Sequence, residues 1–327
     1  MHRRSGVTIV RFLFVFLIFG FGAARAQSPY PSKPIRMIVP LAAASAVDNA
    51  ARILAQRMAD NMKGAIAVEN VPGAAGLIGT ERLAKSPADG YTIAGFNDSI
   101  MTMLPNLHAK LPWDIRRDFD PVSLVATVEW GLVAANDAPY ANAGALIAAA
   151  KAAPGRINYG SGGNGSPQHI AMALFASSAG ISLVHVPYKG ATQAALDVAA
   201  GQIPVAFQGL ATVATLVRGG KLRLLGVATP QRHPQFPDVP TISESGLPGF
   251  EFNSWFAIMV PAGTPKDIVQ RLHAEIVRAL GDPDVRDKLQ AQGLTPKGST
   301  PEELRKATED QLEKYARLFK QAGISAQ

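Results

Sequence analysis

The sequence predicts an α/β protein with two lobes that are joined by two crossovers. Short β-branched segments alternate with segments of helical spacing, a pattern typical of sheets covered by helices on both faces. A strand, a tryptophan and an apolar run occur in that order twice, near residues 127 and 250. Glycine-containing loops follow several strands and lead into helices, which is where such sheets bind ligands.

The first lobe is predicted to begin with a strand at residues 35–39 and a helix that opens at Ser45. Ser45 with Asp48 resembles a capping box, with Asp in place of Glu. Apolar residues recur at helical spacing in this helix, at Ile53, Leu54, Met58 and Met62. Two strands with a helix between them complete this part of the chain, at residues 65–68, 92–95 and 78–84 respectively.

The second lobe is predicted to alternate in the same way, and parallel sheets follow from this alternation. Its strands are expected at residues 157–159, 183–186, 203–207 and 222–228. Its helices are expected from Ala143 onward and at residues 168–176, 191–200 and 212–217. Three helices end the chain, at residues 265–280, 282–292 and 300–321. Thr300 caps the last of them, and Pro301 takes its first helical position.

The repeated strand–tryptophan–strand pattern sets the predicted lobe boundaries. The first copy runs through Trp130 and the second through Trp255, each between two apolar runs. Each copy fits a strand that leaves one sheet and a strand that enters the other. We therefore place lobe 1 at residues 27–127 and 251–327 and lobe 2 at residues 128–250. Two such lobes leave a cleft in which a ligand can bind.

Residues 1–26 have the features of a secretory signal. A basic start precedes an apolar stretch at residues 7–21, and Ala24-Arg25-Ala26 has the small-x-small pattern that predicts cleavage before Gln27. The alternative is a transmembrane anchor, which needs about 20 apolar residues. Because Arg11 interrupts this shorter run, we favour export and expect the mature protein in the periplasm.

Composition and charge exclude several classes of protein. Removing the leader with its four arginines leaves 28 of the 32 Lys and Arg residues against 25 acidic ones, so the mature net charge is +3. That charge is too small for a nucleic-acid-binding signature. The lack of cysteine excludes thiol catalysis, and the six histidines never fall at metal-motif spacing. We expect a monomer with no cofactor, no metal and no nucleic-acid partner.

The segment from Tyr159 to His169 is the most informative in the chain. It reads Tyr-Gly-Ser-Gly-Gly-Asn-Gly-Ser-Pro-Gln-His, after a short strand and before a helix. Glycines let the backbone approach a ligand, and the helix start presents free N–H groups and a partial positive charge. The segment therefore predicts an anion-binding site made of main chain.

Two other interpretations of this segment are weaker. Its G-x-G-x-x-G spacing from Gly160 matches the dinucleotide fingerprint, but residues 182–189 supply no acid for the ribose hydroxyls. Ser161 and Ser166 lack the G-x-S-x-G frame of a nucleophile, and no third group can be assigned to a nearby histidine base. Turn formation and helix capping explain both serines, and a capping serine can also bind an anion.

Six strings in the chain resemble, in order, those of a known family. Pro261-Ala262-Gly263-Thr264-Pro265 matches its P-A-G-T-P, and the others lie at residues 30–36, 68–74, 88–92, 185–190 and 237–241. Over essentially the whole mature chain, the sequence resembles the Bug-type solute-binding proteins of tripartite tricarboxylate transporters. The resemblance implies a type II periplasmic-binding-protein fold, whose lobes close on a small carboxylate held by backbone N–H groups and small polar side chains.

The sequence departs from the family pattern at the loop after the first strand. Ala44 and Ser45 stand where the family has two glycines, and they would be strained if those glycines have positive φ. Val71 replaces an Arg, and Gln208 replaces an Asp, which removes a charge that would repel an anion. These departures predict a ligand with more apolar body than a plain dicarboxylate. The candidate ligand-binding residues are Leu41, Ala43, Ala44, Ser45, Val47, Asn97, Ser99, Ser161, Gly162, Asn164, Gly165, Ser166 and Gln208.

Two further loops also follow strands. Residues 68–76 fit either a tight strand-to-helix connection or the border of the cleft, and residues 96–99 fit either a solvated turn or a cleft-facing loop.

The function predicted from these observations is that of a periplasmic receptor, not an enzyme. It would capture a small carboxylate, such as a di- or tricarboxylate, an aromatic acid or an acidic amino acid, and deliver it to the membrane subunits of a transporter. A binding protein that serves a two-component sensor kinase is the alternative, and a periplasmic enzyme is the third hypothesis.

Overall fold

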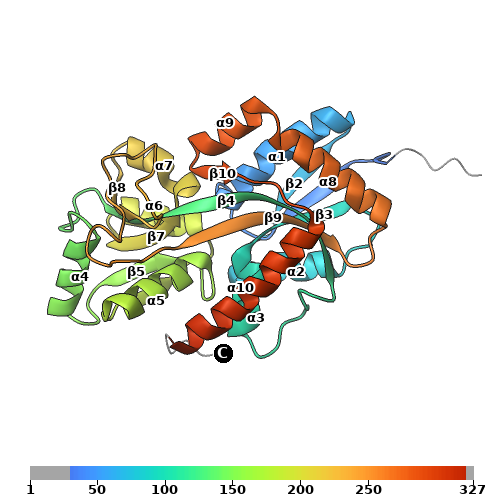
Figure 1. The fold of residues 1–327 in the computed structure, drawn as a ribbon. Coiled ribbons are helices and arrows are strands. Elements are labelled where there is room, and N and C mark those ends of the chain that lie inside the picture. Colours follow the sequence, from blue (N-terminus) through green and yellow to red (C-terminus); the bar gives the residue numbers. More distant parts are fainter. Residues whose placement is uncertain (1–29, 322–327) are drawn as a thin grey trace, which may run out of the picture.

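The computed structural model describes residues 30–321, so the predicted leader at residues 1–26 lies outside the described residues (Figure 1). The strands are β1 (Ile35–Val39), β2 (Ile66–Asn70), β3 (Thr92–Asn97), β4 (Phe119–Ala135), β5 (Asn158–Ser161), β6 (Val184–Pro187), β7 (Val205–Gly209), β8 (Leu222–Val227), β9 (Asn253–Pro261) and β10 (Leu294–Pro296). The long helices are α1 (Ala46–Met62), α2 (Leu77–Ala84), α4 (Ala143–Ala152), α5 (Pro167–Ala179), α6 (Ala191–Ala199), α7 (Leu210–Arg218), α8 (Lys266–Leu280), α9 (Pro283–Ala291) and α10 (Pro301–Gln321). Three short turns of helix are η1 (Ala74–Gly76), η2 (Ser99–Met103) and α3 (Leu104–Leu107).

One strand, β4, joins the two halves of the molecule. The main strand order is β2-β1-β3-β9-β4-β7-β5-β6, and β8 and β10 also pair with β4. The amino-terminal part of β4 pairs with β9 and β10, and its carboxyl-terminal part pairs with β7 and β8. We call β1–β3, β9 and β10 with their helices the first lobe, and β5–β8 with α4–α7 the second lobe. In Figure 1, β4 and β9 run between the two groups.

The sequence pattern predicted two strands around Trp130, but the structure has a single strand of 17 residues there. Trp130 lies within it and does not interrupt it, because its indole is buried and its Nε1–H donates to Ser254 Oγ of β9 at 2.7 Å. The return crossing runs through the connection between β8 and β9. The proposed boundaries, 27–127 with 251–327 and 128–250, stay a prediction.

The strand directions are mixed. The strands β1, β2 and β3 are parallel, as are β5, β6 and β7. The strands β8, β9 and β10 are antiparallel to β4. The prediction of parallel sheets was therefore correct for β1–β3 and for β5–β7. It was wrong for the pairs that β4 forms, because hydrophobic spacing does not indicate the direction of a strand.

Alternation of strand and helix places the carboxyl ends of β1, β2, β5, β6 and β7 next to the starts of helices. Turn chemistry sets where these helices begin. Ser45 Oγ accepts the Asp48 N–H at 3.3 Å, and Ser166 Oγ accepts the His169 N–H at 3.4 Å. The predicted cap of α10 is part of a reciprocal capping box: Thr300 Oγ1 accepts the Glu303 N–H at 3.1 Å, and the Glu303 carboxylate accepts the Thr300 N–H at 2.8 Å.

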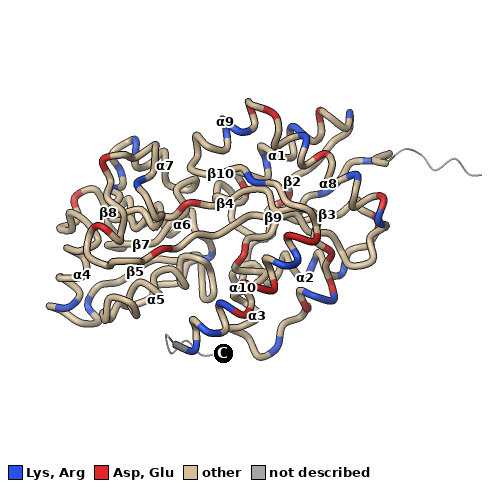
Figure 2. Tube along the Cα trace, viewed as in Figure 1, with Lys and Arg blue, Asp and Glu red and all other residues tan. Residues whose placement is uncertain are grey.

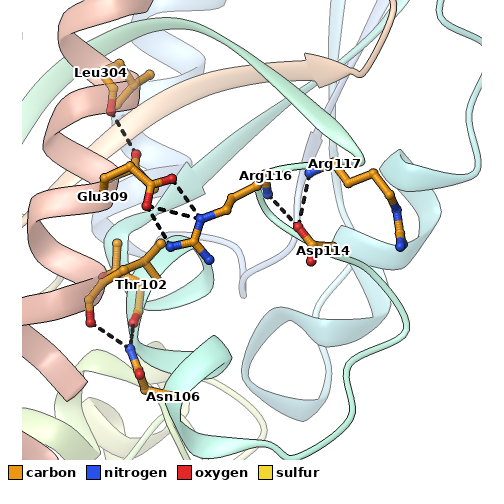
Figure 3. A network of polar contacts seen from close by, with 9 residues as sticks. Thr102, Asn106, Asp114, Arg116, Arg117, Leu304 and Glu309 are labelled. Carbon is orange, nitrogen blue, oxygen red and sulfur yellow. Dashed lines mark hydrogen bonds and ion pairs between the residues drawn. The ribbon is translucent and has the colours of Figure 1, made fainter.

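The carboxyl-terminal helix α10 packs against the segment that follows β3 and fixes its position. The Arg116 guanidinium binds Glu309 of α10 through Nε and Nη2, with the shortest contact at 2.6 Å (Figure 3). The Asn106 amide donates to the carbonyls of Thr102, at 2.8 Å, and Leu312, at 3.0 Å. The end of β3 is thereby tied to a helix that lies far from it in the sequence.

Acidic and basic residues are interspersed over both lobes (Figure 2). In the part of the chain that the structure describes, residues 30–321, no helix is long and apolar enough to cross a membrane. Within the same residues, no group of His, Asp and Glu side chains has the arrangement of a metal site.

Candidate functional site

A small cavity of about 40 Å³ lies between the lobes, beside the paired strands β4 and β9. This volume holds a few water molecules, so a larger occupant needs the lobes to move apart. A larger hollow of about 660 Å³ lies beside Glu129, but no helix start of the described chain lines it. The smaller cavity is lined by Pro40, Leu41, Ala42, Ser45, Ala46, Val47, Pro72, Gly73, Ala75, Gly76, Asn97, Val128, Trp130, Gly162, Ser166, Pro167, Gln168, Lys189, Gly190, Ala191, Gly209, Thr212 and Ser254.

The N-cap residues of five helices line this cavity. They are Ser45 of α1, Gly76 of α2, Ser166 of α5, Gly190 of α6 and Gly209 of α7. Each helix start carries free N–H groups and about half a positive charge. Three of the five caps are glycines that make no side-chain cap, so no side chain occupies the N–H groups of these helix starts. At α2, the N–H groups of Gly76 and Leu77 are bonded to the Gly73 and Ala74 carbonyls. The two lobes thus direct five positive helix ends at one small volume, which favours an anion there.

Four hydroxyl groups that line the cavity already accept an N–H and keep their own proton. Ser45 and Ser166 accept from their helices as described above. Thr212 Oγ1 accepts the Ala46 N–H at 3.0 Å, and Ser254 Oγ accepts from Trp130. Among residues 30–321, none of the four hydroxyls donates to a protein acceptor. Four free O–H donors around one cavity favour an occupant that supplies acceptors.

The charge of the lining has one sign. Lys189, which is exposed, is the one charged side chain among the lining residues of the described chain. Asn97 uses its Oδ1 to accept the Ile100 N–H at 3.1 Å, which leaves its amide N–H groups to donate. The Gln168 side chain is buried beside them. A carboxylate here would meet donors and no like charge, whereas a cation would meet neither a carboxylate nor a metal-type ligand set.

The loop between β1 and α1 takes a strained path that depends on Asp48. Ala44 has φ 58°, as expected if it replaces a glycine of positive φ, but Ser45 has φ −71° and is not strained. The buried Asp48 carboxylate accepts the Ala44 N–H at 2.8 Å and the Asn70 amide at 2.9 Å, and binds Arg52. The predicted capping box is therefore altered, because Asp48 reaches back to Ala44 and not to Ser45.

Two stacked histidines support the 161–166 loop from behind. His185 Nε2 lies 2.5 Å from Ser161 Oγ, and His169 Nδ1 accepts the Gly165 N–H at 3.1 Å. The two rings stack with centroids 4.2 Å apart. Burial lowers the pKa of His169, and burial together with the neighbouring His169 lowers the pKa of His185 to about 4. Both rings are therefore neutral at pH 7.

The structure brings some of the predicted residues to the cavity and not others. Those that line it are Leu41, Ser45, Val47, Asn97, Gly162 and Ser166. Ala43, Ala44 and Asn164 are exposed outside it. Ser99, Ser161, Gly165 and Gln208 are buried behind it in hydrogen bonds: Ser99 with the Gly165 carbonyl at 2.7 Å, Ser161 with His185, and the Gln208 amide with the Ala191 carbonyl at 3.2 Å. Contact of the predicted residues with a ligand stays a prediction.

Several lining residues were missed by the sequence analysis. Thr212 and Ser254 were not considered, because a threonine early in a helix and a serine in a strand carry no local signal. Gly190 was inside a string used only for the family resemblance. The 72–76 loop was recognised, and its backbone is unusual: Ala74 and Ala75 have φ of 46° and 53°. Left-handed alanines are strained, and strain of this kind clusters at functional sites.

The lobes touch each other directly around the cavity, so the structure is closed. Gly190 of the second lobe lies close to Ala42 of the first lobe, because a β-carbon added at Gly190 would lie 2.5 Å from Ala42 Cβ. Around the cavity, hydrogen bonds join the lobes at Ser99 Oγ to Gly165 O (2.7 Å), Thr192 Oγ1 to Ala43 O (2.8 Å), Ala46 N to Thr212 Oγ1 (3.0 Å) and Asn49 Nδ2 to Ala211 O (3.1 Å). Farther from it, Arg218 Nη2 of α7 donates to the Ala291 carbonyl of α9 at 3.1 Å.

Two lobes joined by crossing strands and closed around a cavity rich in donors define a solute-binding protein. The comparisons with known proteins agree. The chain belongs to the tripartite tricarboxylate transporter family receptors, whose family model matches residues 50–324. Protein BugT of Bordetella pertussis is 34% identical over 322 residues, which are 97% of this chain and 99% of BugT.

Solved structures give the same result. The periplasmic binding protein BugD has a TM-score of 0.87 and 31% identity, covering 91% of this chain and 100% of BugD. R. palustris Rpa4515 with adipate has a TM-score of 0.88 and 30% identity, with the same coverage. The Bug-type resemblance and the two-lobe type II fold are therefore confirmed. Since the family consists of binding receptors, the prediction that this chain is not an enzyme is confirmed too.

Proposed function

We propose that this chain captures a small carboxylate in the periplasm, between its two lobes, and delivers it to the membrane subunits of a tripartite tricarboxylate-type transporter. The observation that carries the proposal is the meeting of five helix N-caps at one cavity. A carboxylate gives acceptors to the free N–H and O–H groups without needing a buried Arg. Each such charge-assisted bond contributes roughly 1.5–3 kcal/mol.

The apolar wall and the single lysine narrow the class of ligand. Pro40, Pro72, Val47 and Trp130 form an apolar surface along the cavity. Lys189 stands exposed at the lining and can pair with a second anionic group. An acid with an apolar chain and a distal carboxylate satisfies both features, and the adipate in the similar R. palustris structure is an acid of this kind.

A thermal-shift screen tests the ligand class. We expect linear dicarboxylates to raise the melting temperature, because a ligand at 100 times its Kd adds about 2.7 kcal/mol of stability. The screen would also include tricarboxylates, aromatic acids and acidic amino acids. The diamide of each active diacid is the matched control and should give no shift. Equal shifts from diacid and diamide, or no shift from any acid, would refute carboxylate recognition.

Delivery to a transporter is tested in cells that lack the membrane subunits. Uptake of the labelled acid should then stop, while the purified receptor still binds it. If uptake is unchanged but transcription of a target operon no longer responds to the acid once the receptor is removed, the protein serves a sensor kinase.

The mature receptor is expected to be a monomer in solution, and light scattering would measure its mass.

Export is the basis of the proposed location. The basic start, the apolar stretch and Ala24-Arg25-Ala26 predict a mature chain that begins at Gln27. N-terminal sequencing of protein from the periplasmic fraction should read from Gln27. Protein that remains in the membrane fraction with Met1 at its start would contradict this prediction.

A further inference from the structure

The two stacked histidines lie outside the cavity but contact both ends of the loop that borders it. His185 of β6 meets Ser161 at the start of the loop, and His169 of α5 meets Gly165 near its end. Ser161 Oγ also accepts the Gly163 N–H at 3.1 Å inside the loop. The cavity-lining residues Gly162 and Ser166 belong to the same segment. The rings therefore act on the cavity through the loop and not by contact with an occupant.

The hydrogen bonds set the protonation state that the loop requires. His169 Nδ1 accepts a backbone N–H, so its proton is on Nε2 and the ring is neutral. A second proton on Nδ1 would remove this acceptor and leave the Gly165 N–H without a partner. With ring centroids 4.2 Å apart and planes within 5°, two charged imidazoles would also repel each other strongly.

The surroundings offer no compensating charge. Tyr159 of β5 stacks on the other side of His185 at 4.9 Å, and its phenol is neutral because burial raises its pKa. The strand β7, which packs on α5, has no ionisable residue. On the neighbouring helix α6, Asp197 is bonded to the Tyr188 hydroxyl at 2.8 Å. In the described chain, the pair is thus surrounded by aromatic and backbone groups with no carboxylate to stabilise a proton.

We propose that His169 and His185 are positioning residues, which hold the 161–166 loop in its binding shape while both rings are neutral and release it when His169 gains a proton on Nδ1. The proposal rests on the proposed function, because the loop matters only if the cavity binds an acid. The sign follows from the lowered pKa values. The neutral pair stabilises the loop fully above the ordinary histidine pKa of about 6.5, and that stability is lost as the pH falls through the lowered pKa of His169.

The test compares the wild type with variants that keep the contacts but cannot titrate. In His169→Asn the amide oxygen can take the place of Nδ1, and in His185→Gln the amide can take the place of Nε2. Affinity for adipate would be measured by calorimetry from pH 8 to pH 4.5. Protonation of the diacid itself affects all proteins equally, so the ratio of their Kd values isolates the histidines.

We expect wild-type affinity to fall at least tenfold more than that of the double variant over this range. At pH 8 the double variant should bind within about threefold of the wild type, whereas His169→Ala should bind at least tenfold more weakly because Gly165 loses its acceptor. Circular dichroism and thermal unfolding at pH 8 would establish that each variant folds. Parallel pH profiles for wild type and double variant would overturn the proposal, as would wild-type affinity in His169→Ala.

A measurement on the ligand-free protein separates this proposal from the proposed function. In NMR spectra, the Gly165 amide should shift with the same midpoint as the His169 ring, whose pKa burial lowers, and should not shift in His169→Asn. A Gly165 amide that stays constant while His169 titrates would disprove the coupling. Absence of binding to every acid at pH 8, with the coupling intact, would instead reject the proposed function.

Discussion

Replacing Gly162 with Asp is expected to lower affinity for the carboxylate by at least a hundredfold, which corresponds to about 2.7 kcal/mol. Gly162 lines the cavity and its φ is not in the left-handed region, so an L-residue fits its backbone. A β-carbon there would lie 3.1 Å from the Ala191 N at the start of α6 and 3.1 Å from Gln168 Oε1. The new carboxylate would take the N–H groups that the ligand needs and repel the ligand's charge.

The control for this substitution is Gly162→Asn, which has nearly the same shape and no charge. Its affinity should fall much less, and the difference between the two variants measures the electrostatic part. Calorimetry gives both Kd values. If Asp and Asn reduce affinity equally, the loop excludes the ligand by size alone and is not an anion site.

Gly165→Asp also follows from the predicted anion loop and should weaken binding at least tenfold, but it is a less specific test. Gly165 has φ +77°, and a β-carbon there would lie 2.7 Å from Leu104 Cδ2 across the cleft. Its carbonyl also accepts from Ser99. Strain, steric conflict and charge would all contribute to the loss.

Replacing Gly190 with Ala is expected to hold the lobes apart and to reduce affinity by ten- to a hundredfold. Gly190 has φ −174°, an extended conformation open to any residue, so the second lobe itself should tolerate the change. The added methyl would lie 2.5 Å from Ala42 Cβ of the first lobe, a distance that non-bonded carbons do not occupy. The conflict exists only when the cleft is closed, so the variant should favour an open form.

The second substitution Ala42→Gly removes the opposing methyl and is the matched control. The double variant should regain most of the lost affinity, because the two changes act on one contact. Small-angle scattering should show a larger radius of gyration for Gly190→Ala than for wild type or double variant. In wild type, an open free form would contract when the acid binds. Failure of Ala42→Gly to restore binding would mean that Gly190 acts through its own N–H groups and not through closure.

Local chemistry was enough to determine several features of this protein. The strand–helix alternation predicted the positions of the main helices and strands, because the hydrophobic periodicity and the capping residue of each element lie within that element. The capping by Thr300, Ser45 and Ser166 follows from neighbours within a few residues. The positive φ of Ala44 was expected only from the glycine that the family has at this position. The glycine loop before α5 was also predicted from its local sequence, as a loop that leads into a helix and borders a cleft.

The tertiary structure alone decided which of these features meet. Ser254 and Trp130 come from two crossing strands, and Thr212 and Ala46 from helices of different lobes. No local pattern reports such pairs, because they depend on how β4 and β9 bring the lobes together. The same packing turned Ser161 towards His185 and Gln208 towards the Ala191 carbonyl, so two polar residues predicted at the cavity are buried behind it. The sequence indicates where helices begin. Their positive N-terminal ends can act together on one anion only because the fold brings all five to the same cavity.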